Sequence, residues 1–279
     1  MTHRGKLIFL PPNRVWRTYP GGRTLDELAG APVPADTHLA EDWIASTTQA
    51  VNRGREQIAE GVSQVCVGDA PATRDFARLL ASDPEYFLGP VHVAKYGAQP
   101  QLLVKYLDSG TRLHFQVHPT REFARRVLGA PSGKTEAYYV LAGRDSAPAV
   151  HPSLPSSAGS DVAAETLVKA EPAGYIYVGF QRPPSRAQLR EMILHQDELI
   201  GATQTDCFRV YRTTFRDSVV KDENSAVIAI VTRGAVTVSV GGCSHRLATY
   251  DKFFLPAQLG PVTFTPEPNA EILECLPPL

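Results

Sequence analysis

The chain has 279 residues, 43% of them hydrophobic and 20% charged, with a formal net charge of −1. This composition suits a globular protein with a sizeable core, and it excludes a global basic field for nucleic acid. No apolar run is long enough to cross a membrane, and the N-terminus lacks the apolar stretch of a secretory signal. We therefore expect a cytoplasmic protein with no nucleic-acid or membrane partner.

Glycine, proline and cysteine narrow the fold class. The 21 glycines and 23 prolines are many for a helical protein and suit frequent turns between short strands. The four cysteines are widely spread and form no Cys-x-x-Cys, so we expect thiols in a reducing compartment rather than a disulfide framework. The sequence has no Walker loop, Rossmann fingerprint or Gly-x-Ser-x-Gly elbow. These features together predict a mainly β fold.

The N-terminal half is predicted to consist of short strands with a few short helices. Residues 1–50 are expected to form strands and loops, with a helical turn capped by Asp36. Apolar residues recur at helical spacing over 72–82 and 120–128, which predicts two short helices. Strands are predicted over three further segments: 101–107, 112–118 and 136–141.

The C-terminal half begins with a loop, a strand and a helix, and from about residue 207 onward it is predicted to be almost entirely strands. A Pro-, Ser- and Ala-rich surface loop is predicted over 147–160, then a strand over 175–180 and a helix over 185–198. Valines alternate with polar residues before Gly241-Gly242, which predicts a hairpin over 235–248. Further strands are predicted over 227–231, 252–255, 262–264 and 271–276.

The most informative residues lie between Leu113 and Pro119. Gln116 and His118 are two residues apart, and in a strand this spacing puts both side chains on one face. Glu136 follows 18 residues after His118, far enough to return on a neighbouring strand, and Lys134 precedes Glu136 by two residues. An imidazole, a carboxylate and an amide oxygen can bind a divalent cation such as zinc. A lysine beside such a metal suits the stabilisation of negative charge on a sugar or other polyol.

Two plainer interpretations stay open on these residues alone. The Gln-x-His spacing is also typical of a solvated strand face, because antiparallel sheets often expose one face. Lys134 and Glu136 are also consistent with a structural ion pair. The surrounding sequence has to decide between these possibilities.

Four blocks of sequence, in this order and spacing, resemble the type I mannose-6-phosphate isomerases, a cupin family of zinc aldose–ketose isomerases. The blocks are 102–108, 113–119, 122–124 and 133–138. Upstream, Trp16, Gly21-Gly22, Leu25 and 40–46 resemble the opening strands of that family. Downstream, 207–211, 232–234 and 250–257 resemble its second cupin module.

The resemblance implies a fold and a domain plan. It implies a cupin jelly-roll fold with a few short helices and two modules, of which the first is incomplete. Residues 1–200 are expected to form the N-terminal module with the metal site and short helical insertions, and residues 201–279 the C-terminal β module.

The resemblance also implies a function. The expected reaction is the zinc-dependent conversion of mannose 6-phosphate to fructose 6-phosphate through a cis-enediol, by a monomer with one zinc ion per chain. Gln116, His118 and Glu136 correspond to three of the four metal ligands of the family. Lys134 corresponds to a catalytic lysine, and Lys105 to a lysine that binds the charged substrate.

The sequence departs from the family around residues 198–206, where several tens of residues of the family pattern are missing. No Pro-x-Gly-x-x-His, the element that supplies the fourth ligand, occurs in the chain, and the active-site arginine of that region has no counterpart. Three explanations stay open: a truncated enzyme, a non-catalytic cupin that binds metal or sugar phosphate, or a substitute ligand such as His114.

Overall fold

The computed structural model describes residues 3–70, 73–114, 116–130, 132–141, 198–201, 205–215, 217–268 and 270–278. The loop predicted over 147–160 and the strand over 175–180 lie outside these residues. The helix predicted over 185–198 also lies outside them, except for Glu198, which begins strand β7.

The chain divides into two compact units. One unit comprises Met1–Val117 together with His195–Leu279, and the other comprises His118–Leu194. The predicted division into modules at 200/201 stays a prediction. Within the first unit, the largest sheet takes strands from both of the predicted modules.

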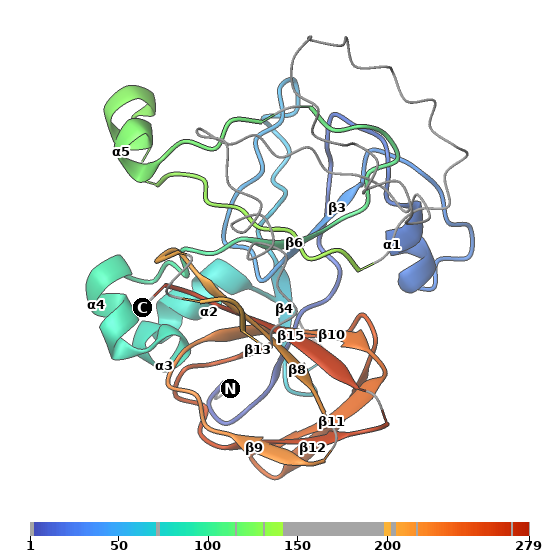
Figure 1. Cartoon of the computed structure of the whole chain (residues 1–279), viewed down its shortest axis with the longest axis vertical. Coiled ribbons are helices and arrows are strands. Elements are labelled where there is room, and N and C mark those ends of the chain that lie inside the picture. Colours follow the sequence, from blue (N-terminus) through green and yellow to red (C-terminus); the bar gives the residue numbers. More distant parts are fainter. Residues whose placement is uncertain are drawn as a thin grey trace, which may run out of the picture. The chain divides into compact units, whose positions relative to one another are not determined.

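Three antiparallel sheets build the first unit (Figure 1). The eight-stranded sheet has the order β5-β4-β1-β13-β10-β15-β8-β7. Its strands are β1 (Ile8–Phe9), β4 (Gln64–Val67), β5 (Thr73–Asp75), β7 (Glu198–Ile200), β8 (Arg209–Thr214), β10 (Val227–Arg233), β13 (Lys252–Leu255) and β15 (Glu271–Leu276).

Two smaller sheets complete the first unit. The four-stranded sheet, β12-β11-β14-β9, is made of β9 (Val219–Lys221), β11 (Ala235–Val240), β12 (Cys243–Ala248) and β14 (Val262–Pro266). The three-stranded sheet, β2-β3-β6, is made of β2 (Arg14–Val15), β3 (Glu41–Ile44) and β6 (Val104–Leu107).

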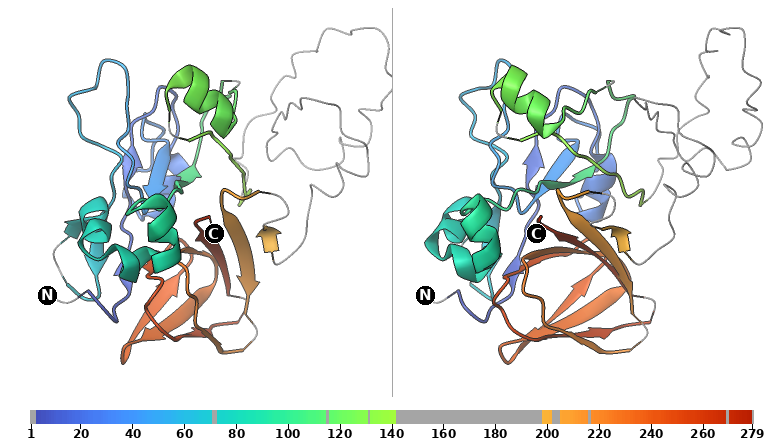
Figure 2. Two further views of the ribbon diagram at one scale, coloured as in Figure 1. Left: turned by 90° about the vertical axis from the view of Figure 1, so that its left-hand side faces the viewer. Right: turned by 60° about the vertical axis from the view of Figure 1, so that its left-hand side comes forward.

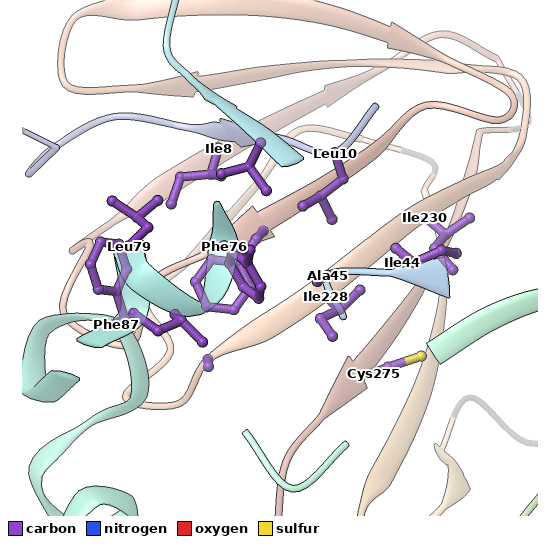
Figure 3. Close-up of a cluster of buried hydrophobic side chains, with 14 of the residues drawn as sticks. Ile8, Leu10, Ile44, Ala45, Phe76, Leu79, Phe87, Ile228, Ile230 and Cys275 are labelled. Atoms are coloured by element: carbon purple, nitrogen blue, oxygen red, sulfur yellow. The ribbon is translucent and has the colours of Figure 1, made fainter. Parts of the chain in front are cut away.

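Strand β10 has a continuous apolar sequence because both of its faces are buried. Val227, Ala229 and Val231 belong to a core shared with the four-stranded sheet, where they meet residues such as Val238 and Phe264. The alternate residues of β10 face a second core on the opposite side of the sheet, built with Ile8, Phe76 and Ile44 (Figure 3). A strand that is buried on both faces needs apolar residues at every position.

The hairpin predicted over 235–248 is confirmed. β11 and β12 pair in register from Ala235↔Ala248 to Val240↔Cys243. Gly241 and Gly242 both have positive φ, at 58° and 78°, which a two-residue hairpin turn of this kind requires. A side chain at Gly241 would also lie 2.3 Å from the carbonyl oxygen of Gly5, so the turn packs against the N-terminal segment.

The helices are short. They are α1 (Arg23–Leu28), α2 (Phe76–Ser82), α3 (Pro84–Leu88), α4 (Pro90–Tyr96), α5 (Arg121–Phe123) and a π-helical turn over Ala124–Leu128. Helices α2, α3 and α4 follow one another and lie together (Figure 2). The helix predicted over 120–128 is confirmed as α5 and the π-helical turn. The helix predicted over 72–82 is confirmed only over α2, because residues 73–75 form strand β5. Helix α2 begins after Asp75, whose side chain accepts a hydrogen bond from Arg78 N at 2.9 Å.

The helical turn predicted after Asp36 is wrong. The described residues 36–40 form no helix, and Asp36 instead accepts a hydrogen bond from Arg23 N at 3.1 Å. It therefore caps α1, a helix that lies earlier in the chain, together with Asp108, which accepts from Thr24 N at 2.7 Å. A cap supplied from a remote segment leaves no local pattern in the sequence.

Two absences apply to the part of the chain that the structure describes. None of the four cysteines, all of them among the described residues, forms a disulfide, and Cys275 is buried. None of the described helices is long and apolar enough to cross a membrane.

Candidate functional site

The two strands predicted to carry the site are wrong for the described residues. No β-ladder includes any of the described segments of these strands, which are 112–114, 116–118 and 136–141. A strand requires a hydrogen-bonded partner strand as well as a suitable side-chain pattern, and the pattern alone does not specify one. The site residues of the second unit are brought together differently, by a close approach of two loops.

The two loops come closest where the backbone of Gly133 contacts the segment Pro119–Arg121. Lys134 N donates a hydrogen bond to Pro119 O at 3.0 Å. A Cβ atom at Gly133 would lie 2.6 Å from Pro119 O and 2.7 Å from Arg121 N, distances that real Cβ atoms do not show. Thr120 then caps helix α5 by accepting from Phe123 N at 3.2 Å. A glycine at 133 is therefore what allows the following residues to lie beside His118.

Three of the predicted site residues meet at one oxygen atom. Glu136 Oε2 is buried, and it lies 3.0 Å from His118 Nε2 and 3.2 Å from Lys134 Nζ. Lys134 Nζ also lies 3.5 Å from His118 Nε2. The Glu136 side chain is 13% exposed, while those of His118 and Lys134 are 34% and 44% exposed. The ion pair that the sequence left open for Lys134 is thus present, within a three-residue cluster.

The donor atoms of this cluster fit a small divalent cation. Two ligands of a tetrahedral zinc ion lie about 3.4 Å apart when each is about 2.1 Å from the metal. His118 Nε2 and Glu136 Oε2 are 3.0 Å apart, so a small opening would admit an ion. Both donors are of the type that zinc binds. The Lys134 ammonium contacts both of them in this structure, so it would have to move aside for an ion.

Gln116 is not placed in the cluster by the described contacts. It is exposed and belongs to the first unit, whereas His118 begins the second. Within the described residues no group of three or more His, Cys, Asp and Glu side chains is placed to hold a metal ion. The candidate set has two such residues, and its third ligand would be the amide of Gln116. Its convergence with His118 and Glu136 stays a prediction.

Lys105 belongs to a second charged cluster, in the first unit. Strand β6 carries Lys105 beside β3, and Lys105 Nζ donates to Glu41 Oε1 at 3.2 Å. Tyr19 Oη donates to the same oxygen, and Trp43 Nε1 donates to Glu41 Oε2 at 2.7 Å. Arg17 Nε lies 3.7 Å from Glu41 Oε2. One buried carboxylate therefore collects two cations and two neutral donors.

The environment of Glu41 keeps its carboxylate charged. Burial raises the pKa of Glu41, but the charge of Lys105 and the hydrogen bonds from Tyr19 and Trp43 outweigh it, so that the pKa lies below its usual value. The sequence prediction missed Glu41, Arg17 and Tyr19 as site candidates. One feature of the sequence could have indicated this cluster. Glu41 and Asp42 are adjacent acidic residues in a strand that also carries Trp43 and Ile44, and carboxylates that are buried in a strand need cationic or hydrogen-bonding partners.

A cavity of about 340 Å³ lies elsewhere in the first unit, and none of the predicted site residues lines it. Its wall includes Asp42 and Lys252, whose side chains form an ion pair and are each only 5% exposed. We assign this cavity no part in the predicted chemistry.

Gly133→Ala is expected to disrupt the cluster without changing any of its side chains. The added methyl group would push Lys134 and Glu136 away from Pro119 and so separate Glu136 from His118. We expect Gly133→Ala to lose at least tenfold in zinc affinity, the scale at which misplaced ligands act. Isothermal titration with zinc measures this. Gly129→Asn is the control, because a Cβ at Gly129 meets no atom within 4 Å and asparagine tolerates the φ of 63° at this position. Equal affinity in the Gly133→Ala and native chains would contradict the assignment.

Comparison with known proteins supports the fold. No protein-family model and no curated protein sequence matches the chain. Among solved structures, mannose 6-phosphate isomerase from Salmonella typhimurium, bound to fructose 6-phosphate and zinc, matches with a TM-score of 0.62 and 13% identity, over 98% of this chain and 100% of that one. Mannose 6-phosphate isomerase from Bacillus subtilis matches with a TM-score of 0.60 and 16% identity, over 97% and 99% of the two chains.

The chain has the fold of the mannose-6-phosphate isomerases. The mainly β, cupin-type architecture predicted from the sequence is confirmed by these matches and by the antiparallel sheets. The TM-scores of 0.60–0.62 establish a shared fold, but at 13–16% identity they do not extend to activity, which has to be argued from the side chains.

Proposed function

We propose that this chain is a zinc-dependent aldose–ketose isomerase of the mannose-6-phosphate isomerase type, which acts on a sugar phosphate. One observation carries the proposal. His118 and Lys134 converge on a single oxygen of Glu136, and these are residues to which the sequence resemblance assigns metal binding and catalysis. The match to an isomerase structure bound to zinc and fructose 6-phosphate agrees with it at the level of the fold.

In this proposal Gln116, His118 and Glu136 hold one zinc ion. When bound, zinc supplies a Lewis acid for the sugar oxygens at C1 and C2. The protein side chains then supply position and charge. Glu136 fixes the location of the Lys134 ammonium through the 3.2 Å contact, so that this charge lies beside the metal ligands.

Lys134 is proposed as the catalytic group. Conversion of an aldose to a ketose moves a proton between C2 and C1 and passes through an enediol whose oxygens carry negative charge. The Lys134 ammonium is 44% exposed and can therefore reach a bound sugar, where it stabilises that charge or takes part in the proton transfer. Lys105, at 24% exposed, is proposed to attract the negative charge of the substrate.

The expected rate is low. The chain lacks the Pro-x-Gly-x-x-His element of the family and the arginine that accompanies it. Loss of one positioned electrostatic donor costs about 10²–10³ in rate, and loss of a ligand together with an arginine should cost more. This absence favours a second candidate function, a non-catalytic cupin that binds metal or sugar phosphate.

A coupled assay separates the two functions. Fructose 6-phosphate formation from mannose 6-phosphate is measured with the purified chain, with and without added zinc. An isomerase should show zinc-dependent turnover that Lys134→Met lowers by about 10²–10³. If the chain binds zinc and sugar phosphate yet forms no product, the non-catalytic function replaces the proposed one. Turnover of tens per second, within the common range of about 1–10³ per second, would mean that a further residue completes the site, and His114 would be tested first.

A further inference from the structure

The cavity of about 340 Å³ in the first unit has the size and the mixed wall of a small-molecule site. Ligand sites are typically cavities of about 300–1,000 Å³ that are mostly apolar and carry a few polar groups. The polar part of this wall comes from Arg14, Asp42 and residues 249–252. The apolar part comes from residues 9–12 and from helix α1 with its C-cap, namely Leu25, Leu28 and Ala29. All of these residues belong to the first unit, so one compact part of the chain forms the cavity.

The buried charges in this wall are already paired. Lys252 and Asp42 form a buried ion pair, and Arg14 Nη1 donates to Asp26 Oδ1 at 2.8 Å. The remaining charged residue of the wall, Asp251, is exposed, so water solvates its carboxylate. A charged ligand would lose its hydration in the cavity and would meet no unpaired opposite charge among the described buried side chains. The cavity therefore favours an uncharged ligand.

Tyr250 is held at the wall of this cavity in an unfavourable backbone conformation. Its φ is 88°, in the region that favours glycine and that bulky residues rarely adopt. Tyr250 N donates to Val231 O at 2.9 Å, and Asp251 N donates to Ala248 O at 2.9 Å, so the surrounding backbone fixes this conformation. The ring stacks on that of Tyr106, with centroids 4.7 Å apart and an angle of 18° between the planes. Strained residues that their surroundings fix in place occur often at ligand sites.

The hydroxyl group of Tyr250 is available to a ligand. It makes no hydrogen bond with the described residues. Burial, followed by the charges of Asp108 and Asp42, raises the pKa of Tyr250, so the phenol stays protonated and can donate. Asp42 and Arg14 both act on this hydroxyl through their charges, and both line the cavity. A hydroxyl oxygen on a ligand can accept the hydrogen bond that Tyr250 offers.

The cavity is separate from the residues to which metal and substrate are assigned, none of which lines it. Glu41, which accepts from Lys105, and Asp42, which lines the cavity, are neighbours on strand β3. Successive side chains of a strand point to opposite faces, so strand β3 separates the Glu41 cluster from the cavity.

We propose that this cavity binds an uncharged, mostly apolar ring compound that carries a hydroxyl group. The apolar wall takes the ring, and the Tyr250 hydroxyl donates to the hydroxyl oxygen of the ligand. A sugar phosphate is charged and mostly polar, so this is a second site that does not depend on the proposed function.

The test is calorimetric titration of the full chain with four compounds that share a p-tolyl group: p-cresol, toluene, p-toluate and p-methylbenzylammonium. They carry a hydroxyl group, no polar group, a negative charge and a positive charge, respectively. We expect p-cresol to bind about 3- to 10-fold more tightly than toluene, the factor that one hydrogen bond supplies. Each charged compound should bind about tenfold more weakly than p-cresol, or weaker still, because its charge loses hydration.

Tyr250→Phe removes the hydroxyl and keeps the stacked ring. It should weaken the binding of p-cresol by about 3- to 10-fold and leave the binding of toluene unchanged. Loss of the fold would weaken both compounds, so the difference between them reports the hydroxyl alone. Tyr96→Phe makes the same change outside the cavity wall and should alter neither compound.

Leu28→Trp tests the location of the site. Leu28 lines the cavity and is 39% exposed, so a larger side chain there takes up space in the cavity without disturbing the core. It should weaken p-cresol and toluene alike, by about tenfold or more, because it occupies the position of the ring. Val33→Trp is the control, since Val33 is 79% exposed and lies outside the cavity wall.

Four results would overturn the proposal. They are a native chain that binds none of the four compounds at millimolar concentration, equal binding of p-cresol and toluene, tighter binding of either charged compound than of p-cresol, and unchanged p-cresol binding in Leu28→Trp. Mannose 6-phosphate at millimolar concentration should not displace p-cresol, and displacement would contradict a separate site. A chain that forms no fructose 6-phosphate and still shows these preferences would lose the proposed function and keep the second site.

Discussion

Lys252→Ala is expected to lower the free energy of unfolding by about 3–5 kcal/mol, the cost of removing one partner from a buried ion pair. Lys252 Nζ donates to Asp42 Oδ2, and both side chains are 5% exposed. The two residues are 210 positions apart, so the pair ties strand β13 to strand β3. Without the lysine, the Asp42 carboxylate stays buried with the Asn13 backbone N–H, at 2.7 Å, as its remaining hydrogen-bond donor among the described residues.

Urea unfolding of the variants measures this effect. Asp42→Asn combined with Lys252→Met should recover much of the lost stability, since no unpaired charge is left buried. Arg246→Ala, which breaks an exposed ion pair with Glu267, is the control and should have a far smaller effect. A Lys252→Ala chain that unfolds at the same urea concentration as the native chain would show that the pair contributes nothing.

His118→Ala is expected to abolish zinc retention. Its Nε2 atom lies 3.0 Å from Glu136 Oε2, and it is the only nitrogen ligand in the proposed set of Gln116, His118 and Glu136. Two oxygen ligands from flexible side chains should not retain zinc against a mild chelator, because they leave half of a four-coordinate shell to water. Elemental analysis after dialysis against the chelator gives the metal content.

His114→Ala is the matched control for this experiment. His114 is also exposed and lies four residues upstream in the same segment. We expect His114→Ala to keep its zinc. If instead His114→Ala loses zinc and His118→Ala keeps it, the ligand has been assigned to the wrong histidine.

The C-terminal half of the fold could be predicted closely from the sequence. The expected strands over 252–255 and 271–276 coincide with β13 and β15, and the hairpin over 235–248 coincides with β11 and β12. These elements follow from alternation, continuous apolar runs and a Gly-Gly turn, all of which are local signals. Helix α1 was missed because its capping carboxylates, Asp36 and Asp108, come from distant segments.

The sequence predicted which residues make up the candidate site, but not the backbone structure that brings them together. The resemblance indicated His118, Lys134 and Glu136, and these side chains do meet. The strands meant to hold them do not form in the described residues, because side-chain alternation does not specify a hydrogen-bonded partner. The contact depends on Gly133, which lets two backbone segments approach closely. The Glu41 cluster was missed for a related reason, since its donors come from three separate segments.

The zinc content of the unmodified chain tests the central claim most directly. The chain is purified, incubated with excess zinc, dialysed against metal-free buffer, and analysed for metal per polypeptide. A site formed by Gln116, His118 and Glu136 predicts about one zinc ion per chain. A chain that is folded yet retains less than about a tenth of a zinc ion would contradict the claim, and the contact of Lys134 and His118 with Glu136 would then be an ion-pair cluster with a purely structural role.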